Sequence, residues 1–327
     1  MTWGKRLITQ SDIEQMRQRP AMYVGNTGQM GVCNLIFGLV EEFVDVSGKA
    51  NVFITMTLAD DDSLVFTCDR MIDTGSSLPL AVAKALSDIF DLSYENEQRN
   101  KIKILFRPDK SIFAYDKVDY YRLYNRFKEL SQLNDNVRFL LSDGSNRNSI
   151  QYHNGLNALL KENMCEFHLE DLQPMNLFFT ERNVEVSLSM ALGYPADVAL
   201  SYVNNSRTHG GGSHVKGLYD GVYASFEKYM EAIKGLNIKY LRKDLIDDLN
   251  FVISVRTKHP MYGGNTKRKL SDMDVRDAVR DGVQKSLDTI LESDRSFFDA
   301  SSIIQLAAFM YTVKSAIKKD NPNIDWD

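Results

Sequence analysis

The stretch from residue 31 to residue 68 constrains the fold most, because it joins a helical pattern directly to two strand patterns. Apolar residues recur at helical spacing between residues 31 and 46, which predicts a helix with one buried face. Residues 52–57 read VFITMT and predict a strand. Three aspartates at 60–62 predict a turn before a second strand at 63–68, so we expect a hairpin.

The flanking segments predict further elements of both kinds. Residues 11–14 read SDIE, the spacing of a capping box, so a short helix is expected to run to about Arg19 and to stop before Pro20. The remaining patterns in this half predict helices at residues 80–92 and 120–133 and a strand at residues 101–106, which a turn at 108–109 follows.

A second block of helices and strands begins near residue 178. Its alternating segments predict strands at residues 184–188, 198–203 and 251–255. A Gly-rich loop and a long helix are expected after the second of these strands, and two helices before Pro322. A chain of 327 residues exceeds the usual size of one domain, so we expect two, at residues 1–160 and 161–327.

Charge and cysteine content exclude several classes of protein. The net charge of −5 and pI near 5.7 provide no global attraction for DNA or an acidic membrane, although a local basic patch is compatible with them. Cys33, Cys68 and Cys165 are far apart and odd in number, which predicts neither a disulfide framework nor a zinc site. The N-terminus has no signal-peptide pattern and the apolar run at 303–313 is too short to span a bilayer, so a cytoplasmic protein is expected.

Three sequence runs are specific enough to indicate a family. Residues 17–25 read RQRPAMYVG, residues 201–217 read SYVNNSRTHGGGSHVKG, and residues 252–270 run from VISV to GGNTKRKL. In order and spacing these runs resemble the ATPase and transducer regions of the B subunits of DNA gyrase and topoisomerase IV. The similarity extends through FRPD at 106–109 and FKELSQLN at 127–134, and so covers nearly the whole chain. One Gly-rich run alone would be weak evidence for a family, whereas a chance match of all three runs is improbable.

The resemblance implies an α+β fold of two domains, a GHKL-type α/β sandwich followed by a transducer domain with a mixed sheet and helices. In this family the first domain binds ATP with Mg²⁺ and dimerises, and the transducer directs a lysine at the γ-phosphate. The resemblance assigns that lysine to Lys267, with Asn265 where the family has glutamine. The alternative is that residues 267–269 form a solvated basic turn; we expect the loop to be retained and its phosphate contact to be lost.

The resemblance places the family's catalytic glutamate on Gly38, which has no side chain, and its magnesium-binding asparagine on Glu42. Hydrolysis requires a carboxylate that orients water and a metal that neutralises the phosphates. Shifting the alignment by one helical turn makes Glu42 the base but puts Val46 at the metal position, where it cannot ligate a hard cation. Both alignments therefore lack a necessary group.

The nucleotide pocket that the resemblance implies is also altered. Asp69 follows the strand at 63–68 and corresponds to the adenine-binding aspartate, but the next residues read RMIDT in place of a Gly-rich run. The interval 75–92 lacks the glycines whose N–H groups would hold phosphates. Ile102 replaces a threonine that contacts the base in the family. If a nucleotide binds, the assigned residues are Asp69, Asn265 and Lys267.

These observations predict no catalytic residue, no metal ligand and no resident cofactor; ATP and Mg²⁺ are expected only if the site survives. The leading hypothesis is a degenerate gyrase-B-like module without ATP hydrolysis that acts by binding or as a homodimer, in contact with gyrase or topoisomerase IV subunits. The alternative is an ATP-binding component of a type II DNA topoisomerase. A third hypothesis is a DNA-associated protein, which the net charge does not support.

The cleavage-support domain of the family does not follow before Asp327, so DNA cleavage by this chain alone is not expected. The apolar segment at 303–313 is expected to be a packing or dimer surface.

Overall fold

The computed structural model describes residues 7–47, 50–70, 72–95, 101–164, 174–192, 198–234, 249–264 and 267–292. The chain divides into two compact units, Met1–Gly155 and Leu156–Asp327, which are described separately. The expected helices near the C-terminus that include residues 303–313, and the predicted binding residue Asn265, lie outside the described residues.

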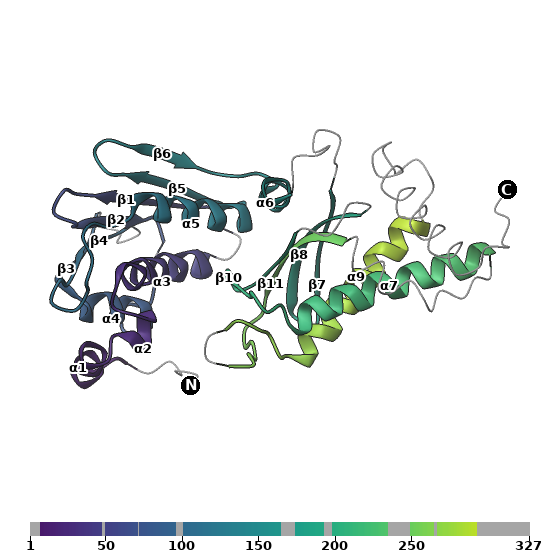
Figure 1. Cartoon of the computed structure of the whole chain (residues 1–327), viewed down its shortest axis with the longest axis horizontal. Helices are drawn as coiled ribbons and strands as arrows, with labels where there is room; N and C mark the ends of the chain where they lie inside the picture. The colour runs from purple at the N-terminus through teal and green to yellow at the C-terminus, as the bar shows by residue number, and fades with distance from the viewer. Residues whose placement is uncertain are drawn as a thin grey trace. The chain divides into compact units, whose positions relative to one another are not determined.

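The first unit combines a mixed sheet with helices packed against it (Figure 1). Its described helices are α1 (Gln10–Gln18), α2 (Ala21–Val24), α3 (Gln29–Ser47), α4 (Leu78–Ala85) and α5 (Tyr120–Leu133), and α6 (Gly155–Asn163) begins at its last residue. Its described strands are β1 (Val52–Leu58), β2 (Leu64–Cys68), β3 (Ser87–Tyr94), β4 (Ile102–Pro108), β5 (Val137–Ser142) and β6 (Arg147–Ile150).

These six described strands lie in the order β3-β4-β2-β1-β5-β6. The predicted hairpin is confirmed, because β1 and β2 pair antiparallel with Met56 opposite Phe66. Strand β5 then pairs parallel with β1 and antiparallel with β6. Helices α3 and α5 contribute buried faces to the same hydrophobic core as the strands, including Phe43, which lies against Phe66 with 4.8 Å between the ring centroids.

Two local predictions in this unit are wrong. The segment 80–92 is not one helix: α4 ends at Ala85 and Ser87 begins β3, which pairs with β4 along its length. The helical period that continues past residue 86 is overridden because aromatic and branched residues in this segment fit a pleated, half-buried strand.

The capping box at the start of α1 is also displaced from the predicted position. The N-cap is Thr9 rather than Ser11: Thr9 Oγ1 accepts from Asp12 N at 3.3 Å, and Thr9 N donates to Asp12 Oδ2 at 2.8 Å. An aspartate can replace glutamate as the reciprocal acceptor, so two capping frames were compatible with this sequence.

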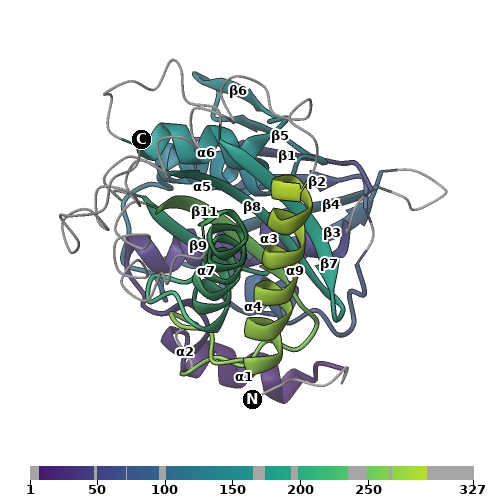
Figure 2. The ribbon, with the colours of Figure 1, turned by 90° about the vertical axis from the view of Figure 1, so that its right-hand side faces the viewer.

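The second unit has a five-stranded sheet among its described residues, in the order β10-β9-β11-β8-β7. The strands are β7 (Met175–Glu181), β8 (Val184–Leu192), β9 (Ala199–Val203), β10 (Ser206–Arg207) and β11 (Leu249–Arg256), and the helices are α7 (Ser213–Lys234) and α9 (Met273–Glu292). Figure 2 shows α7 and α9 side by side in front of β7, β8 and β11. The helices approach closely, because a Cβ added to Gly221 would lie 2.6 Å from the carbonyl oxygen of Arg280.

The two sheets with their helices confirm the α+β fold class that the sequence predicts. Among the described residues, none of the helices is both long enough and apolar enough to cross a membrane.

Candidate functional site

Helix α3 carries Gly38 and Glu42, the positions to which the resemblance assigned the catalytic base and the metal ligand. A Cβ added at Gly38 would lie 4.0 Å from the Cβ of Pro79 in α4. Any side chain at position 38 would therefore leave α3 toward the first turn of α4. The contact is an ordinary van der Waals distance, so alanine fits at this position without a steric clash.

Glu42 also faces the start of α4. Burial raises the pKa of the Glu42 carboxyl, and a side-chain hydrogen bond with Ser77 partly offsets this effect. Ser77 is the N-cap of α4, where its Oγ accepts from Leu80 N at 3.3 Å. Groups of three or more metal-ligating side chains are absent from the described part of the chain.

The turn before α4 uses its own backbone donors. Asp73 accepts hydrogen bonds from Gly75 N at 3.1 Å and from Ser76 Oγ at 2.7 Å, both through its carboxylate. Its carbonyl oxygen accepts from Ser76 N and Ser77 N at 3.3 and 3.0 Å. A phosphate-binding loop must present free N–H groups to its ligand. The N–H groups of residues 75–77 instead complete the turn that begins α4.

Asp69 lies at the end of β2 and is exposed. Its Oδ1 accepts a hydrogen bond from Phe53 N at 3.0 Å, which joins it to the beginning of β1. Beside it, Cys68 is paired with the fully buried Ile102 across β2 and β4. Burial raises the pKa of the Cys68 thiol to about 12, as expected for a packed side chain. Ile102 belongs to the hydrophobic core of the first unit.

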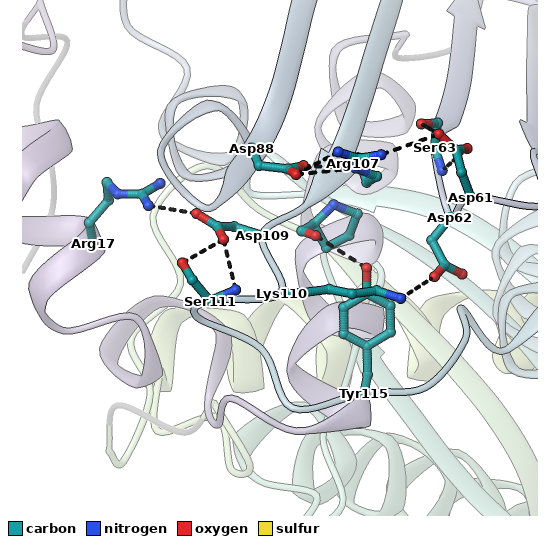
Figure 3. Close-up of polar contacts among 11 residues, drawn as sticks. Arg17, Asp61, Asp62, Ser63, Asp88, Arg107, Asp109, Lys110, Ser111 and Tyr115 are labelled. Atoms are coloured by element: carbon teal, nitrogen blue, oxygen red, sulfur yellow. Dashed lines mark hydrogen bonds and ion pairs between the residues drawn. The ribbon is translucent and has the colours of Figure 1, made fainter.

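Two motifs that carried the resemblance contact each other in the first unit (Figure 3). Arg17 Nη2 lies 2.6 Å from Asp109 Oδ2, and Arg17 Nη1 donates to the carbonyl oxygen of Ala85 at 2.7 Å. Ser111 donates to Asp109 Oδ1 through both its N–H and its hydroxyl, at 2.8 and 2.6 Å. Arg17 therefore connects α1 with the end of α4 and, through Asp109, with the chain after β4.

A second set of charges lies on the strands nearby (Figure 3). Arg107 on β4 pairs with Asp88 on β3 at 2.7 Å and with Asp61 in the β1–β2 turn at 3.3 Å. Lys110 pairs with the buried Asp62 at 3.0 Å. Every cation of this cluster faces a carboxylate, so the cluster connects loops and leaves little net charge for a ligand.

A family model for DNA gyrase B matches residues 141–322, more than half of the chain. The chain belongs to the DNA gyrase B family. Among curated relatives, the DNA gyrase B protein of Clostridium acetobutylicum is 25% identical over 94% of this chain and 58% of its own length. The DNA gyrase B protein of Cytophaga aurantiaca is 30% identical over 66% of this chain and 48% of its own length. The chain therefore spans about half the length of the curated relatives it matches.

Solved structures of gyrase B and topoisomerase IV share the fold. The 43K ATPase domain of Thermus thermophilus gyrase B, in complex with an aminocoumarin, superposes with a TM-score of 0.77 at 22% identity, covering 94% of this chain and 95% of that one. The ATP-binding domain of topoisomerase IV from Francisella tularensis gives a TM-score of 0.74 at 22% identity, covering 94% and 98%.

Lys267 is the third residue that the sequence predicts to bind a nucleotide. Lys267 is exposed, has a positive φ of 53°, and donates its backbone N–H to the carbonyl oxygen of Gly264 at 3.3 Å. Asp69 belongs to the first unit and Lys267 to the second. Whether these residues bind a nucleotide stays a prediction.

Sequence reasoning missed the roles of Asp73, which closes the turn before α4, and of Ser77 and Pro79, which face α3. A signal for them was present, because Asp-Thr-Gly-Ser is typical of a turn in which the aspartate accepts from following N–H groups. Ser77 followed by Pro79 is similarly typical of a helix start. What the pattern could not give is the distance between this turn and α3, which depends on tertiary packing.

Proposed function

We propose that this chain is a gyrase-B-like ATPase and transducer region that has lost ATP hydrolysis and acts as a binding or dimerisation module. The observation that carries the proposal is that Gly38, the position to which the family resemblance assigns the catalytic base, has no side chain. The N–H groups of residues 75–77, which are used within their own turn, support it. The domains proposed for these roles are residues 1–160 and residues 161–327.

The partners we propose are a second copy of this chain and a subunit of gyrase or topoisomerase IV, in the cytoplasm. The support is the family itself, since the relatives are named as B subunits of DNA gyrase and, in Aquifex aeolicus, of a type 2 topoisomerase. An ATPase-type fold that keeps its framework without hydrolysis can still present the surfaces of the parent protein. Sedimentation of the purified chain over a range of concentrations tests the homodimer.

The second candidate function is an ATP-binding component of a type II DNA topoisomerase. It is favoured by Asp69 and Lys267, which are both exposed and are the described residues that the family resemblance assigns to the nucleotide. Under this alternative, ATP and Mg²⁺ bind without the base at position 38, and Lys267 would sense the terminal phosphate.

Calorimetry distinguishes the two candidates. The purified chain is titrated with a non-hydrolysable ATP analogue plus Mg²⁺ and, separately, with ADP, and ATP turnover is measured in parallel. The proposal predicts no saturable heat and no magnesium-dependent turnover. Binding that Asp69→Asn and Lys267→Ala both weaken would establish the alternative, and turnover that Lys267→Ala reduces would refute the loss of hydrolysis.

A further inference from the structure

One end of the second unit brings together three loops that are distant in sequence. Strands β9 and β11 are parallel neighbours, so the chain leaves both at the same edge of the sheet. Asn204 and Thr257 join these exits: Asn204 Nδ2 donates to Thr257 O at 2.7 Å, and Thr257 N donates to Asn204 Oδ1 at 2.9 Å. The two exits are therefore held together by a reciprocal pair of hydrogen bonds.

Backbone hydrogen bonds attach the third loop, which carries Lys267, to the Gly-rich segment before α7. Gly210 N donates to Arg268 O at 2.8 Å, and Ser213 N donates to Leu270 O at 2.9 Å. Gly212 has a φ of 135°, and a Cβ there would lie 2.3 Å from the carbonyl oxygen of Leu270. Only glycine permits this approach, so the loops are pre-organised by the backbone rather than by their long side chains.

The same end of the unit collects cations without carboxylates. We name it the basic end and define it by six exposed residues, Arg207, Lys216, Lys258, Lys267, Arg268 and Lys269. The surrounding described residues 198–219, 249–264 and 267–271 contain no Asp or Glu. Within the described part of the chain none of the six forms an ion pair, whereas Arg107, Arg126 and Arg276 elsewhere all do.

The first carboxylate that follows the basic end does not neutralise it at the surface. Asp272 is buried, and its Oδ1 accepts from Val275 N at 3.3 Å at the start of α9. Six positive charges without counter-charges repel one another, and a bound anion would relieve this repulsion.

Two exposed methionines adjoin the basic end. Met261 and Met273 are 57% and 55% exposed. Met261 O accepts from Ser271 N at 2.7 Å and Met261 N donates to Asp272 Oδ2 at 3.4 Å, so both methionines lie at the base of the loop that carries Lys267. Methionine is flexible and polarisable, and it is enriched in protein interfaces together with arginine.

We propose that the basic end docks an acidic segment of a partner protein that also carries apolar side chains; this inference rests on the proposed function as a binding module and names the chemistry of its partner. Because the whole chain has a net charge of −5, the residues outside the basic end carry a net charge of −11. A long nucleic acid that extended beyond the basic end would be repelled by them, whereas a short acidic segment would not.

Fluorescence anisotropy with a labelled synthetic peptide of Asp and Glu interspersed with Leu tests the proposal. The triple variant Lys267→Gln, Arg268→Gln, Lys269→Gln should weaken peptide binding about tenfold, as expected for three partly solvated charge contacts. The control variant Lys84→Gln, Lys103→Gln, Arg147→Gln removes the same charges from exposed, unpaired positions of the first unit and should leave the affinity within about twofold. Circular dichroism verifies that both variants are folded.

The methionines are tested with a second pair of variants and a second peptide. Met261→Ser with Met273→Ser should weaken the Leu-containing peptide and not a version in which Ser replaces Leu. Met22→Ser, at a 74% exposed position of the first unit, is the matched control. Equal effects of the two triple variants, or no binding of the peptide at low salt, would overturn the proposal.

Mixed-sequence duplex DNA is the competing probe. If the duplex binds more tightly than the peptide at equal ionic strength, and the Lys267-loop triple variant abolishes this difference, then the surface binds nucleic acid and the assignment to an acidic protein is wrong. The nucleotide calorimetry is independent of these results. If neither the peptide nor ATP binds, only the docking inference is refuted. Magnesium-dependent ATP turnover would refute only the proposed function.

Discussion

Arg17 and Asp109 form an ion pair of 2.6 Å between two segments that are 92 residues apart in the chain. Arg17 lies in α1 and Asp109 directly after β4, within the RQRP and FRPD motifs that carried the family resemblance. The ion pair therefore links two of the motifs that carried the resemblance within the framework of the first unit.

We expect Arg17→Gln and Asp109→Asn each to lower the free energy of unfolding by about 1 kcal/mol, because the carboxylate is little exposed while the guanidinium is partly solvated. Urea denaturation of the single and double variants measures their coupling. Lys101→Gln is the control, since the Lys101–Glu95 pair has side chains that are 39% and 34% exposed. An additive double variant would show that the pair does not stabilise the fold.

The glycines of α3 provide a test of the packing around the position that the resemblance assigns to the catalytic base. Gly38→Ala should stabilise the protein by about 0.5–1 kcal/mol, because its Cβ makes an ordinary contact with Pro79 and alanine favours a helix. Gly31→Ala should destabilise it by about 2 kcal/mol or more, since its Cβ would lie 1.9 Å from the carbonyl oxygen of Asn26.

Gly38→Glu completes the series and addresses function. It restores the residue type of the family's base, yet we expect no magnesium-dependent ATP turnover and a lower melting temperature than that of Gly38→Ala. Thermal denaturation and a phosphate-release assay measure both quantities. Turnover by Gly38→Glu would show that the glycine alone prevents hydrolysis and that the remaining pocket is intact.

The sequence was sufficient for the elements whose hydrophobic period is unambiguous. Helix α5 was predicted with the bounds that the structure gives, Tyr120–Leu133, because its apolar face repeats over four turns and Pro108 and Asn134 lie outside it. The prediction for the segment around β3 was wrong because the eight residues Ser87–Tyr94 are compatible with either a helix or an edge strand. Pairing with β4, which decides between them, is a long-range contact that local pattern does not contain.

The candidate site shows the same division between local and tertiary information. The absence of a carboxylate at Gly38 could be inferred from the aligned motif. The approach of Pro79 to Gly38 could not, because it depends on how α4 packs on α3 across a separation of 41 residues. The hydrogen bond between Ser77 and Glu42 likewise depends on this packing.

Glu42 provides a test of that packing through its pH dependence. Burial raises its pKa in the folded protein above the unfolded value, so the group favours folding below the unfolded pKa, and this contribution is lost as the pH rises through the folded pKa. At neutral pH the charged carboxylate therefore opposes folding. Glu42→Gln should raise the melting temperature at pH 7 and have less effect at pH 4, as measured by thermal denaturation.

Glu41→Gln is the neighbouring control for Glu42→Gln. Glu41 forms an ion pair of 2.6 Å with Arg126 between α3 and α5, so its neutralisation should lower the melting temperature at pH 7. If Glu42→Gln also destabilised the protein at pH 7, Glu42 would have an attractive partner as an anion, and the description of a carboxyl disfavoured by burial would be incorrect.

His214, at the start of α7, should make the second unit sensitive to acid. Burial lowers the pKa of His214 from 6.5 to about 4, and among the described residues its Nδ1 has no hydrogen-bond partner while Nε2 contacts Thr208 Oγ1 at 3.2 Å. The unfolded chain takes up the proton first, so the stability from neutral His214 is complete above about pH 6.5 and is lost as the pH falls toward 4. The shift corresponds to a loss on the order of 3 kcal/mol at full titration. Urea denaturation at pH 7 and pH 4.5 should show a larger decrease for the wild type than for His214→Gln. Replacing the exposed His209 by Gln is the control and should leave the decrease in the free energy of unfolding between pH 7 and pH 4.5 as it is in the wild type. An equal decrease in all three proteins would mean that His214 titrates normally in the fold.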